Sequence, residues 1–263
     1  MLAYQKIVWI GVAVTAVAIL VLGYILFLAP RGAPKTPSPP DIPALAESGP
    51  EAAADVSPAE PDAAALNLEL DDSDEAVRGL VGSGALPPAL REWLRQKELV
   101  RTVVVMVDNI ARGESPAAQL EFMSPSGAFA TEEKGAVTVM AARGFRRYDP
   151  LVGAFTAVPD TAWIQWYRAL RPTLEKAFRE LGYPGITFAQ RMQQAIGHLL
   201  QVPVLRQDAA LEKKVVSYAF ADPNLEALTP AQKHLLRMGP DNVSRVQKKL
   251  RSLAAALQAA AKK

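Results

Sequence analysis

Apolar side chains are distributed very unevenly along the chain. Residues 7–28 form an unbroken run of 22 uncharged, mostly apolar residues, whereas residues 30–61 hold nine prolines and almost no large apolar side chain. From residue 70 onwards apolar positions recur every three or four residues, which is the period of helices with one buried face. The pattern predicts a transmembrane anchor at residues 1–29, a disordered linker at 30–69 and one compact, mainly helical domain at 70–263 with a small β-hairpin.

The apolar run at residues 7–28 is long enough, as a helix, to cross the roughly 30 Å hydrocarbon core of a bilayer. A cleaved signal peptide is the alternative, but it has a shorter apolar core and a small-residue cleavage site, and Pro30 stands where cleavage is disfavoured. Lys6 before the run and Arg31 and Lys35 after it leave the orientation balanced by charge. Because only six residues precede the span, we expect a single-pass bacterial inner-membrane protein with its domain in the periplasm.

The linker is acidic as well as rich in proline and alanine. Between residues 36 and 77 there are eleven Asp or Glu and no Lys or Arg. Such a segment cannot bury enough surface to offset its ordering entropy, and like charges extend it further. We expect a tether that holds the domain away from the membrane.

Local signals place the first helices of the domain. Ser73 is expected to cap a short helix that runs through Ala76, Val77, Leu80 and Val81. Pro87-Pro88 opens a helix that carries Leu90 and Trp93. Valine enrichment in 99–111 favours a strand, but its polar positions recur at helical spacing, so we predict a helix. In that helix Arg101, Asp108 and Arg112 are expected opposite the apolar stripe of Val100, Val103, Val107 and Ile110.

The middle of the domain has a weaker pattern. Turn residues at 124–127 and an extended piece at 136–141 predict the β-hairpin. A long helix follows from Asp160, kinked at Pro172, with an apolar face that reaches Leu181. A turn at 182–185 leads to a helix over 188–200.

The last helices have sharper boundaries. Thr229 and Gln232 have capping-box spacing around Pro230, and Gly239-Pro240 should end one helix and begin the next. Apolar residues over 243–257 follow a heptad of only about two repeats, so packing against the domain is favoured over a homo-oligomer seam. The cations of this helix are expected to face solvent, namely Arg245, Lys248, Lys249 and Arg251.

The domain is strongly basic although the whole chain carries a net charge of only +2. Beyond residue 75 there are 26 Lys or Arg against 16 Asp or Glu. A basic surface of this kind can bind an anionic polymer, lipid headgroups or nucleic acid, or dock the acidic linker of the same chain.

Signatures of enzymes and cofactors are missing from the sequence. It contains no phosphate-binding loop, dinucleotide fingerprint or nucleophile elbow, and it has no cysteine. His198 and His234 are the two histidines, and we interpret both as ordinary helix residues. We therefore expect no catalytic residues, no metal and no cofactor.

Two short constellations are the candidate binding residues. The first comprises Asp108, Asn109 and Arg112, for which an intrahelical ion pair is the simplest account. The second comprises Arg146, Arg147, Tyr148 and Asp149, where Asp149 can cap a helix beginning at Pro150. The two sets would form a ligand site only if folding brought them together.

Five short motifs together carry a family resemblance. They are Leu70-Asp71-Asp72-Ser73-Asp74, Val107-Asp108-Asn109, Arg147-Tyr148-Asp149-Pro150, Glu180-Leu181-Gly182-Tyr183-Pro184-Gly185 and Leu236-Arg237-Met238-Gly239-Pro240. In this order they resemble the bacterial domain-of-unknown-function family 3014 over roughly residues 68–257. The resemblance implies an N-terminal membrane span, a proline-rich acidic linker and one uncharacterised domain, and it supplies no catalytic residues.

These observations favour a membrane-tethered, non-enzymatic binding or scaffold protein of the cell envelope. Its partner would be an envelope protein or an anionic polymer. The alternatives are an envelope hydrolase or transferase with an unrecognised site, and a cytoplasm-facing binder of protein or nucleic acid. Specific nucleic-acid binding is not expected, because the aromatic residues fall on apolar helix faces instead of alternating with basic residues.

Overall fold

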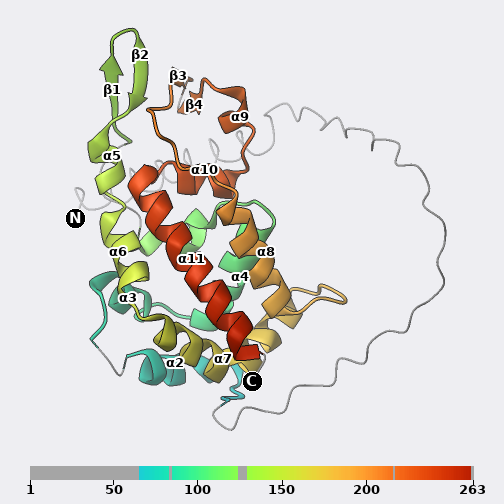
Figure 1. Cartoon of the computed structure of the whole chain (residues 1–263). Helices are drawn as coiled ribbons and strands as arrows, with labels where there is room; N and C mark the ends of the chain where they lie inside the picture. The colour runs from blue at the N-terminus through green and yellow to red at the C-terminus, as the bar shows by residue number, and fades with distance from the viewer. Residues whose placement is uncertain (1–64, 83–84, 124–128, 216, 262–263) are drawn as a thin grey trace, which may run out of the picture. The chain divides into compact units, whose positions relative to one another are not determined.

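The computed structural model describes residues 65–82, 85–123, 129–215 and 217–261 (Figure 1). These residues belong to one compact unit that spans residues 58–263. They are mainly helical with small β-hairpins, which confirms the predicted class. The predicted anchor at 7–28 and the linker up to residue 64 lie outside the described residues. Among the helices that are described, none combines the length and the apolar character needed to cross a membrane.

Short 3-10 segments and small hairpins interrupt the series of helices. In chain order the elements are η1 (Leu70–Asp72), α2 (Ser73–Val81), α3 (Pro88–Trp93), α4 (Leu99–Ala111), η2 (Pro116–Met123), β1 (Thr131–Lys134), β2 (Val137–Met140), α5 (Ala142–Arg146), α6 (Asp149–Ala157), α7 (Asp160–Glu180), α8 (Phe188–Leu200), β3 (Leu211–Lys213), β4 (Tyr218–Phe220), α9 (Pro223–Glu226), α10 (Pro230–Leu236) and α11 (Pro240–Ala261).

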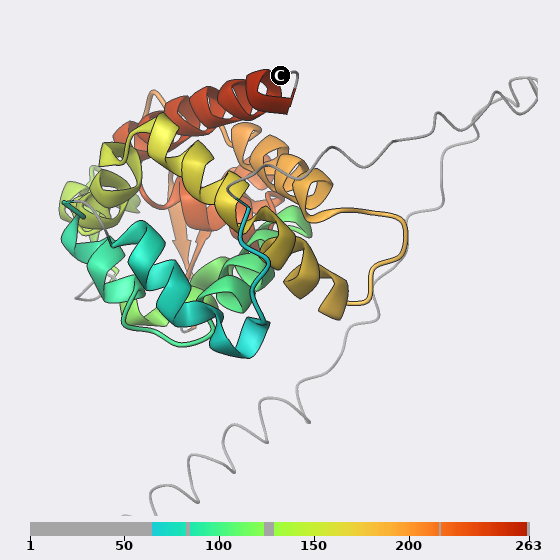
Figure 2. The same ribbon diagram turned by 90° about the horizontal axis from the view of Figure 1, so that it is seen from below.

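A helical core forms where α4 packs against α7 and α8. Its side chains include Leu99, Val104, Phe178 and Phe188, each no more than 1% exposed. Residues 66–68 also lie along α7, because Thr173 Oγ1 donates to the Leu66 carbonyl and accepts from the Leu68 amide. Seen from below, α11 (red) and the early helices α2 and α3 (cyan) lie on opposite sides of the described domain, with α7 and α8 between them (Figure 2).

A second core lies under the two hairpins. In the first hairpin β1 pairs antiparallel with β2, and in the second β3 pairs antiparallel with β4. A single bridge between Val139 and Ala210 joins the two hairpins. The buried side chains of this core are Met140, Val202, Leu211, Phe220, Leu235, Leu236 and Val243. Helix α8 contributes to both cores, with Phe188 in the first and Leu199 against the second.

The predicted β-hairpin is confirmed, but its turn and strands lie at slightly different residues. Its turn lies at Gly135 and Ala136, with Gly135 at φ +64, so Ala136 belongs to the turn and not to an extended piece. The turn residues 124–127 lie outside the described residues. The second hairpin, at residues 211–220, was not predicted, because its two strands of three residues are too short for alternation to be visible.

Most predicted helix boundaries are confirmed. Thr229 and Gln232 form a complete capping box, and Gly239, at φ +89, ends the turn before Pro240 opens α11. Helix α7 continues through Pro172. Leu181 does not extend its buried face, since this side chain is 37% exposed just beyond the last helical residue.

The cap predicted at Ser73 is wrong. Ser73 is the first residue of α2, and its hydroxyl donates backwards to the Leu70 carbonyl at 2.8 Å. This bond joins the 3-10 turn of η1 to the helix, because the hydroxyl satisfies a carbonyl at the junction instead of an amide within α2.

The final helix lies on the body of the domain, against α6, α7 and α8. Val243, Leu250 and Leu253 from the heptad pattern are buried within the chain. Lys249 was expected to face solvent but is only 9% exposed, and its ammonium bonds to the Val158 carbonyl and the Asp160 carboxylate. Lys249 lies at the border between the exposed and the buried face of the helix. Its long side chain lets the ammonium group reach these two acceptors.

Candidate functional site

Asp108 is the centre of a buried charge network. It is 5% exposed, and it lies at i+4 and i+8 from the buried Val104 and Val100. The expectation that it faces away from the apolar stripe is therefore wrong. Arg112, the residue that follows the end of α4, forms the predicted ion pair, with Nε 3.4 Å from Asp108 Oδ2. Two further partners come from other parts of the chain.

The partners that sequence reasoning missed are Arg191 of α8 and Tyr183 of the preceding turn. Arg191 Nε lies 3.0 Å from Asp108 Oδ1 as an ion pair without the alignment of a hydrogen bond, and the Tyr183 hydroxyl donates to Oδ2 at 3.1 Å. The Arg191 guanidinium also lies 4.5 Å from the centre of the Tyr183 ring. The sequence held one signal for these partners: Asp108 lies four and eight residues after two valines, on the same helix face. A carboxylate buried on such a face requires a partner of opposite charge or a hydrogen-bond donor.

Asn109 and Arg112 lie at the edge of this network. Asn109 donates to Gln119 at 3.0 Å and accepts from Arg112 at 3.3 Å. Half of the Arg112 side chain is exposed. This first set therefore ties α4 to η2 and α8, and its charges are directed largely at one another.

Arg147 and Tyr148 belong to a separate network around His234. Arg147 donates to the Tyr148 hydroxyl at 3.1 Å, and the Tyr148 ring meets the His234 ring edge-on at 6.2 Å between centroids. His234 Nδ1 is 3.1 Å from Ser115 Oγ. Burial, together with the nearby Arg237 and Arg147, lowers the pKa of His234 below its usual 6.5.

The predicted cap at Asp149 is also wrong. Asp149 is the first residue of α6, no side chain caps that helix, and its Oδ1 accepts from Asn242 Nδ2 of α11 at 2.8 Å. The carboxylate therefore joins α6 to the first turn of the final helix. Arg146, three residues earlier, is exposed.

The contacts described for the two candidate sets remain separate. The first set connects α4 with η2 and α8, and the second connects the α5–α6 junction with α10 and α11. Neither set contributes to the pocket found among the described residues. Within the same part of the chain, no group of three or more acidic or histidine side chains is placed to hold a metal ion.

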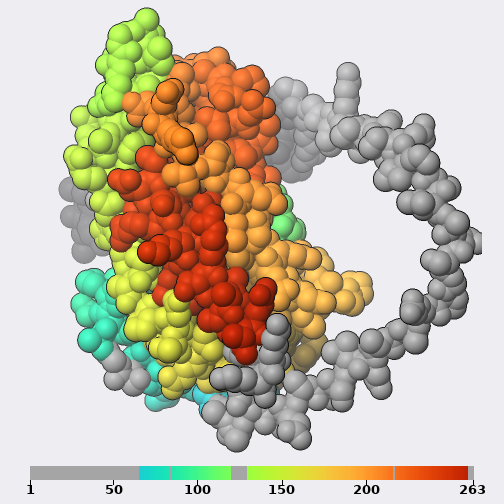
Figure 3. Space-filling view, viewed as in Figure 1, coloured from blue at the N-terminus to red at the C-terminus, as the bar shows by residue number. Residues whose placement is uncertain are grey.

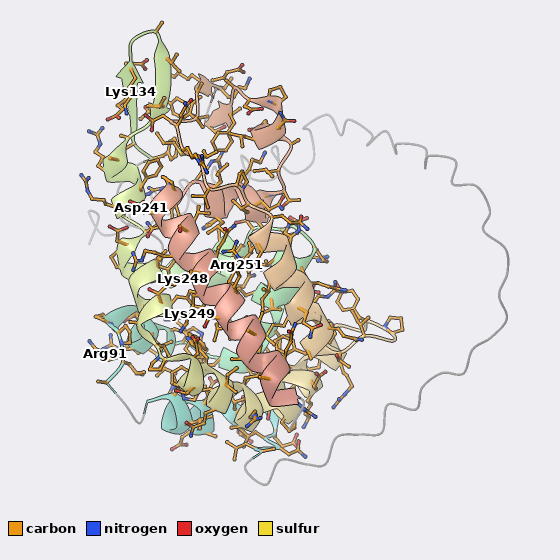
Figure 4. The ribbon with its side chains drawn as sticks, viewed as in Figure 1. Arg91, Lys134, Asp241, Lys248, Lys249 and Arg251 are labelled. Atoms are coloured by element: carbon orange, nitrogen blue, oxygen red, sulfur yellow. The ribbon has the colours of Figure 1, made fainter. Side chains whose placement is uncertain are left out.

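Helix α11 crosses the face of the domain seen in Figure 3, and Figure 4 labels Lys248 and Arg251 on this helix. Arg245, Lys248 and Arg251 are exposed along this helix, and we call them the α11 ridge. Arg245 bonds to the neutral groups of Asn242 and Thr156, and Arg251 bonds to Gln247. In these contacts the two arginines of the ridge bond to neutral side chains and not to carboxylates.

Two cations on other elements, Arg101 and Lys233, are paired with carboxylates. Arg101 of α4 bonds to both Glu180 and Asp71, and Lys233 of α10 bonds to Glu226. The hydrogen bonds that Arg101 donates to Glu180 and Asp71 are the main cause that raises its pKa. These ion pairs connect neighbouring elements of the domain. Among the ridge cations, Arg245 connects α11 to α6 through the neutral Thr156.

A pocket of about 150 Å³ lies where α11 begins. Its walls come from the end of β2 and α5, from the segment before β3, and from the turn between α10 and α11. Its apolar lining comprises Met140, Phe145, Leu205, Ala209, Leu236, Gly239 and Pro240, and its polar lining comprises Arg206, Gln207 and Asp208.

Fold and surface define a small, mainly helical domain with a cationic final helix. The chain belongs to the family described as "Protein of unknown function (DUF3014)", whose model matches residues 99–254. The match confirms the resemblance and covers four of its five motifs; Leu70-Asp71-Asp72-Ser73-Asp74 precedes it. Comparisons with curated proteins and with solved structures found no match.

Proposed function

We propose that this chain is a non-enzymatic binding or scaffold module of the bacterial cell envelope. Residues 7–28 would tether it to the inner membrane, and the basic domain would face the periplasm. The α11 ridge is the observation that carries the binding role. Its three exposed cations lie on one helix, and Arg245 and Arg251 bond to neutral partners. An external anion can therefore approach these two arginines without displacing an internal carboxylate.

The separation of the two candidate residue sets favours binding over catalysis. A hydrolase or transferase would need acid, base and substrate-binding groups around one cavity. Asp108 is instead shared between Arg112 and Arg191, and Asp149 is hydrogen-bonded to Asn242. Both carboxylates have structural partners that explain their positions.

A charge-reversal experiment tests the ridge. The full chain in nanodiscs is titrated with fluorescent poly-L-glutamate at low and at physiological salt. Replacing the ridge by R245E, K248E and R251E is expected to weaken binding by more than about tenfold at low salt. The matched control reverses three exposed cations on other elements, K97E, R179E and K213E, for the same change in net charge.

The two triple variants separate a local site from a general charge effect. Strong loss in the ridge variant and weak loss in the control support the proposal. Equal loss in both would show that net charge alone drives binding, and the ridge would be discarded as a site.

Placement in the envelope is tested by reporter fusions after the final residue. A reporter active only outside the cytoplasm should be active, and one active only inside should be silent. The reverse result would place the domain in the cytoplasm and favour the cytoplasm-facing binder.

A further inference from the structure

We propose that the pocket at the start of α11 and the α11 ridge together bind an acidic peptide segment of a partner protein. One apolar side chain of the segment would occupy the pocket, and acidic side chains beyond it would pair with the ridge. This inference rests on the proposed binding function and adds the class of partner.

The size and lining of the pocket match one side chain. Small-molecule sites usually measure roughly 300–1,000 Å³, whereas this cavity measures about 150 Å³. Phe145, Leu205 and Leu236 form an apolar part of its wall, beside a polar part made by residues 206–208. An apolar pocket that takes a single aromatic or aliphatic anchor is how a few residues supply most of the energy of a protein interface.

Charges at the mouth of the pocket define where the acidic residues can lie. Arg206 lines the pocket and is exposed, while the neighbouring Asp208 is neutralised by Lys134 at 2.6 Å. Asp241 is exposed in the first turn of α11 and would repel an acidic group placed directly beside the pocket. The acidic residues of the partner therefore belong further along the helix.

The helix fixes the spacing between anchor and acidic residues. Pro240 lines the pocket and is the first residue of α11. At a rise of about 1.5 Å per residue, Arg245, Lys248 and Arg251 lie roughly 7, 12 and 16 Å from it along the axis. An extended peptide advances about 3.3 Å per residue, so it reaches these cations about two, four and five residues after its anchor.

The pocket distinguishes a peptide from a simple polyanion. A polyphosphate or an acidic polysaccharide can pair with the ridge but has no aliphatic or aromatic side chain for an apolar cavity. An acidic peptide can occupy both features, and the area that its anchor buries adds to the charge pairing.

The test uses two synthetic peptides labelled with fluorescein. One carries a phenylalanine followed by glutamates from the second position onwards, and the other has serine in place of phenylalanine. Binding to the full chain in nanodiscs is measured by fluorescence anisotropy at two salt concentrations. The phenylalanine peptide should bind about tenfold more tightly, because an aromatic side chain is removed from water.

Two alanine variants test whether the anchor uses this pocket. Ala209→Leu fills the cavity and should abolish the advantage of phenylalanine, whereas Ala221→Leu, at an exposed alanine beyond β4, should retain it. Thermal unfolding of both variants checks that the fold is kept. If Ala209→Leu unfolds the domain, Ala209→Val provides the smaller change.

The outcomes separate this inference from the proposed function. Equal affinity for the two peptides, or an advantage that persists in Ala209→Leu, overturns the pocket while salt-sensitive ridge binding still stands. Loss of salt-sensitive binding for both peptides overturns the ridge and the inference together. Equal, ridge-dependent binding of both peptides and of polyphosphate identifies a general polyanion site instead.

Discussion

The two cores of the domain are built on different principles. The helical core around α4, α7 and α8 is made of segments whose apolar side chains repeat within each helix. The hairpin core brings together residues 140, 202, 211, 220 and 236, from short elements that are far apart in the chain. The first core is therefore visible in local periodicity, while the second exists only through pairings between distant segments.

The cores also differ in how they use charge. The helical core encloses the Asp108 network and is bordered by the carboxylate-bound Arg101. At the hairpin core, Arg206 and the first turn of α11 surround an open pocket. The helical core therefore encloses paired charges, whereas the hairpin core borders the pocket for which we propose a binding role.

The strongest test of this division truncates one aromatic residue in each core. Phe178→Ala in the helical core and Phe220→Ala in the hairpin core should each cost about 3–5 kcal/mol of unfolding free energy, since both side chains are buried. Because α8 contributes to both cores, each variant should unfold in one transition of lower midpoint. Urea denaturation monitored with two spectroscopic probes measures this. A separate early transition in Phe220→Ala would show that the hairpin core unfolds independently of the helical core.

The buried charge network should respond strongly to a change that preserves its shape. Asp108→Asn removes the carboxylate charge opposite Arg191 and should cost about 1.5–3 kcal/mol, because a bond to a charged group is weakened in the interior. Arg112→Ala removes the half-exposed partner and should cost less than about 1 kcal/mol. Equal losses in chemical denaturation would contradict the expectation that the half-exposed Arg112 contributes only a small part of the network's stability.

Two glycines of the hairpin half, one packed and one open, test how tightly the hairpin core is packed. Gly239 has φ +89, and a Cβ there would lie 2.5 Å from Phe145 Cγ, whereas Gly135 has φ +64 with open space around it. Both changes to alanine strain the backbone by about 1–3 kcal/mol, and Gly239→Ala should lose more stability because Phe145 must also move. Thermal melts of the two variants measure the difference.

The smallest expected effect is a pH dependence centred on His234. Its lowered pKa means that the folded state binds a proton less readily than the unfolded state. Stability is therefore full above about pH 6.5 and declines as the pH falls below it, until the lower pKa of the folded state is reached. His234→Gln should flatten this part of the curve, and His198→Gln serves as the control. An unchanged slope in His234→Gln would assign the dependence to other groups.

The sequence predicted the helices and their ends well because those signals are local. The capping box at Thr229 and the turn at Gly239 need only adjacent residues. The Arg191 partner of Asp108, the second hairpin and the burial of Lys249 depend on contacts between distant segments, which one sequence does not specify. The same limit explains why the pocket could not be predicted, since its lining comes from three separate stretches of chain.

Lys248 and Lys249 are neighbours in sequence with opposite surroundings. Lys248 is exposed on the ridge, while the ammonium of Lys249 is held between Val158 and Asp160. An amine-specific reagent should therefore modify Lys248 quickly and Lys249 only when α11 separates from α6 and α7. The labelling rate of Lys248 serves as the reference, and the labelling rate of Lys249 reports the separation of α11. The ratio of the two rates therefore measures how often the final helix separates from the domain.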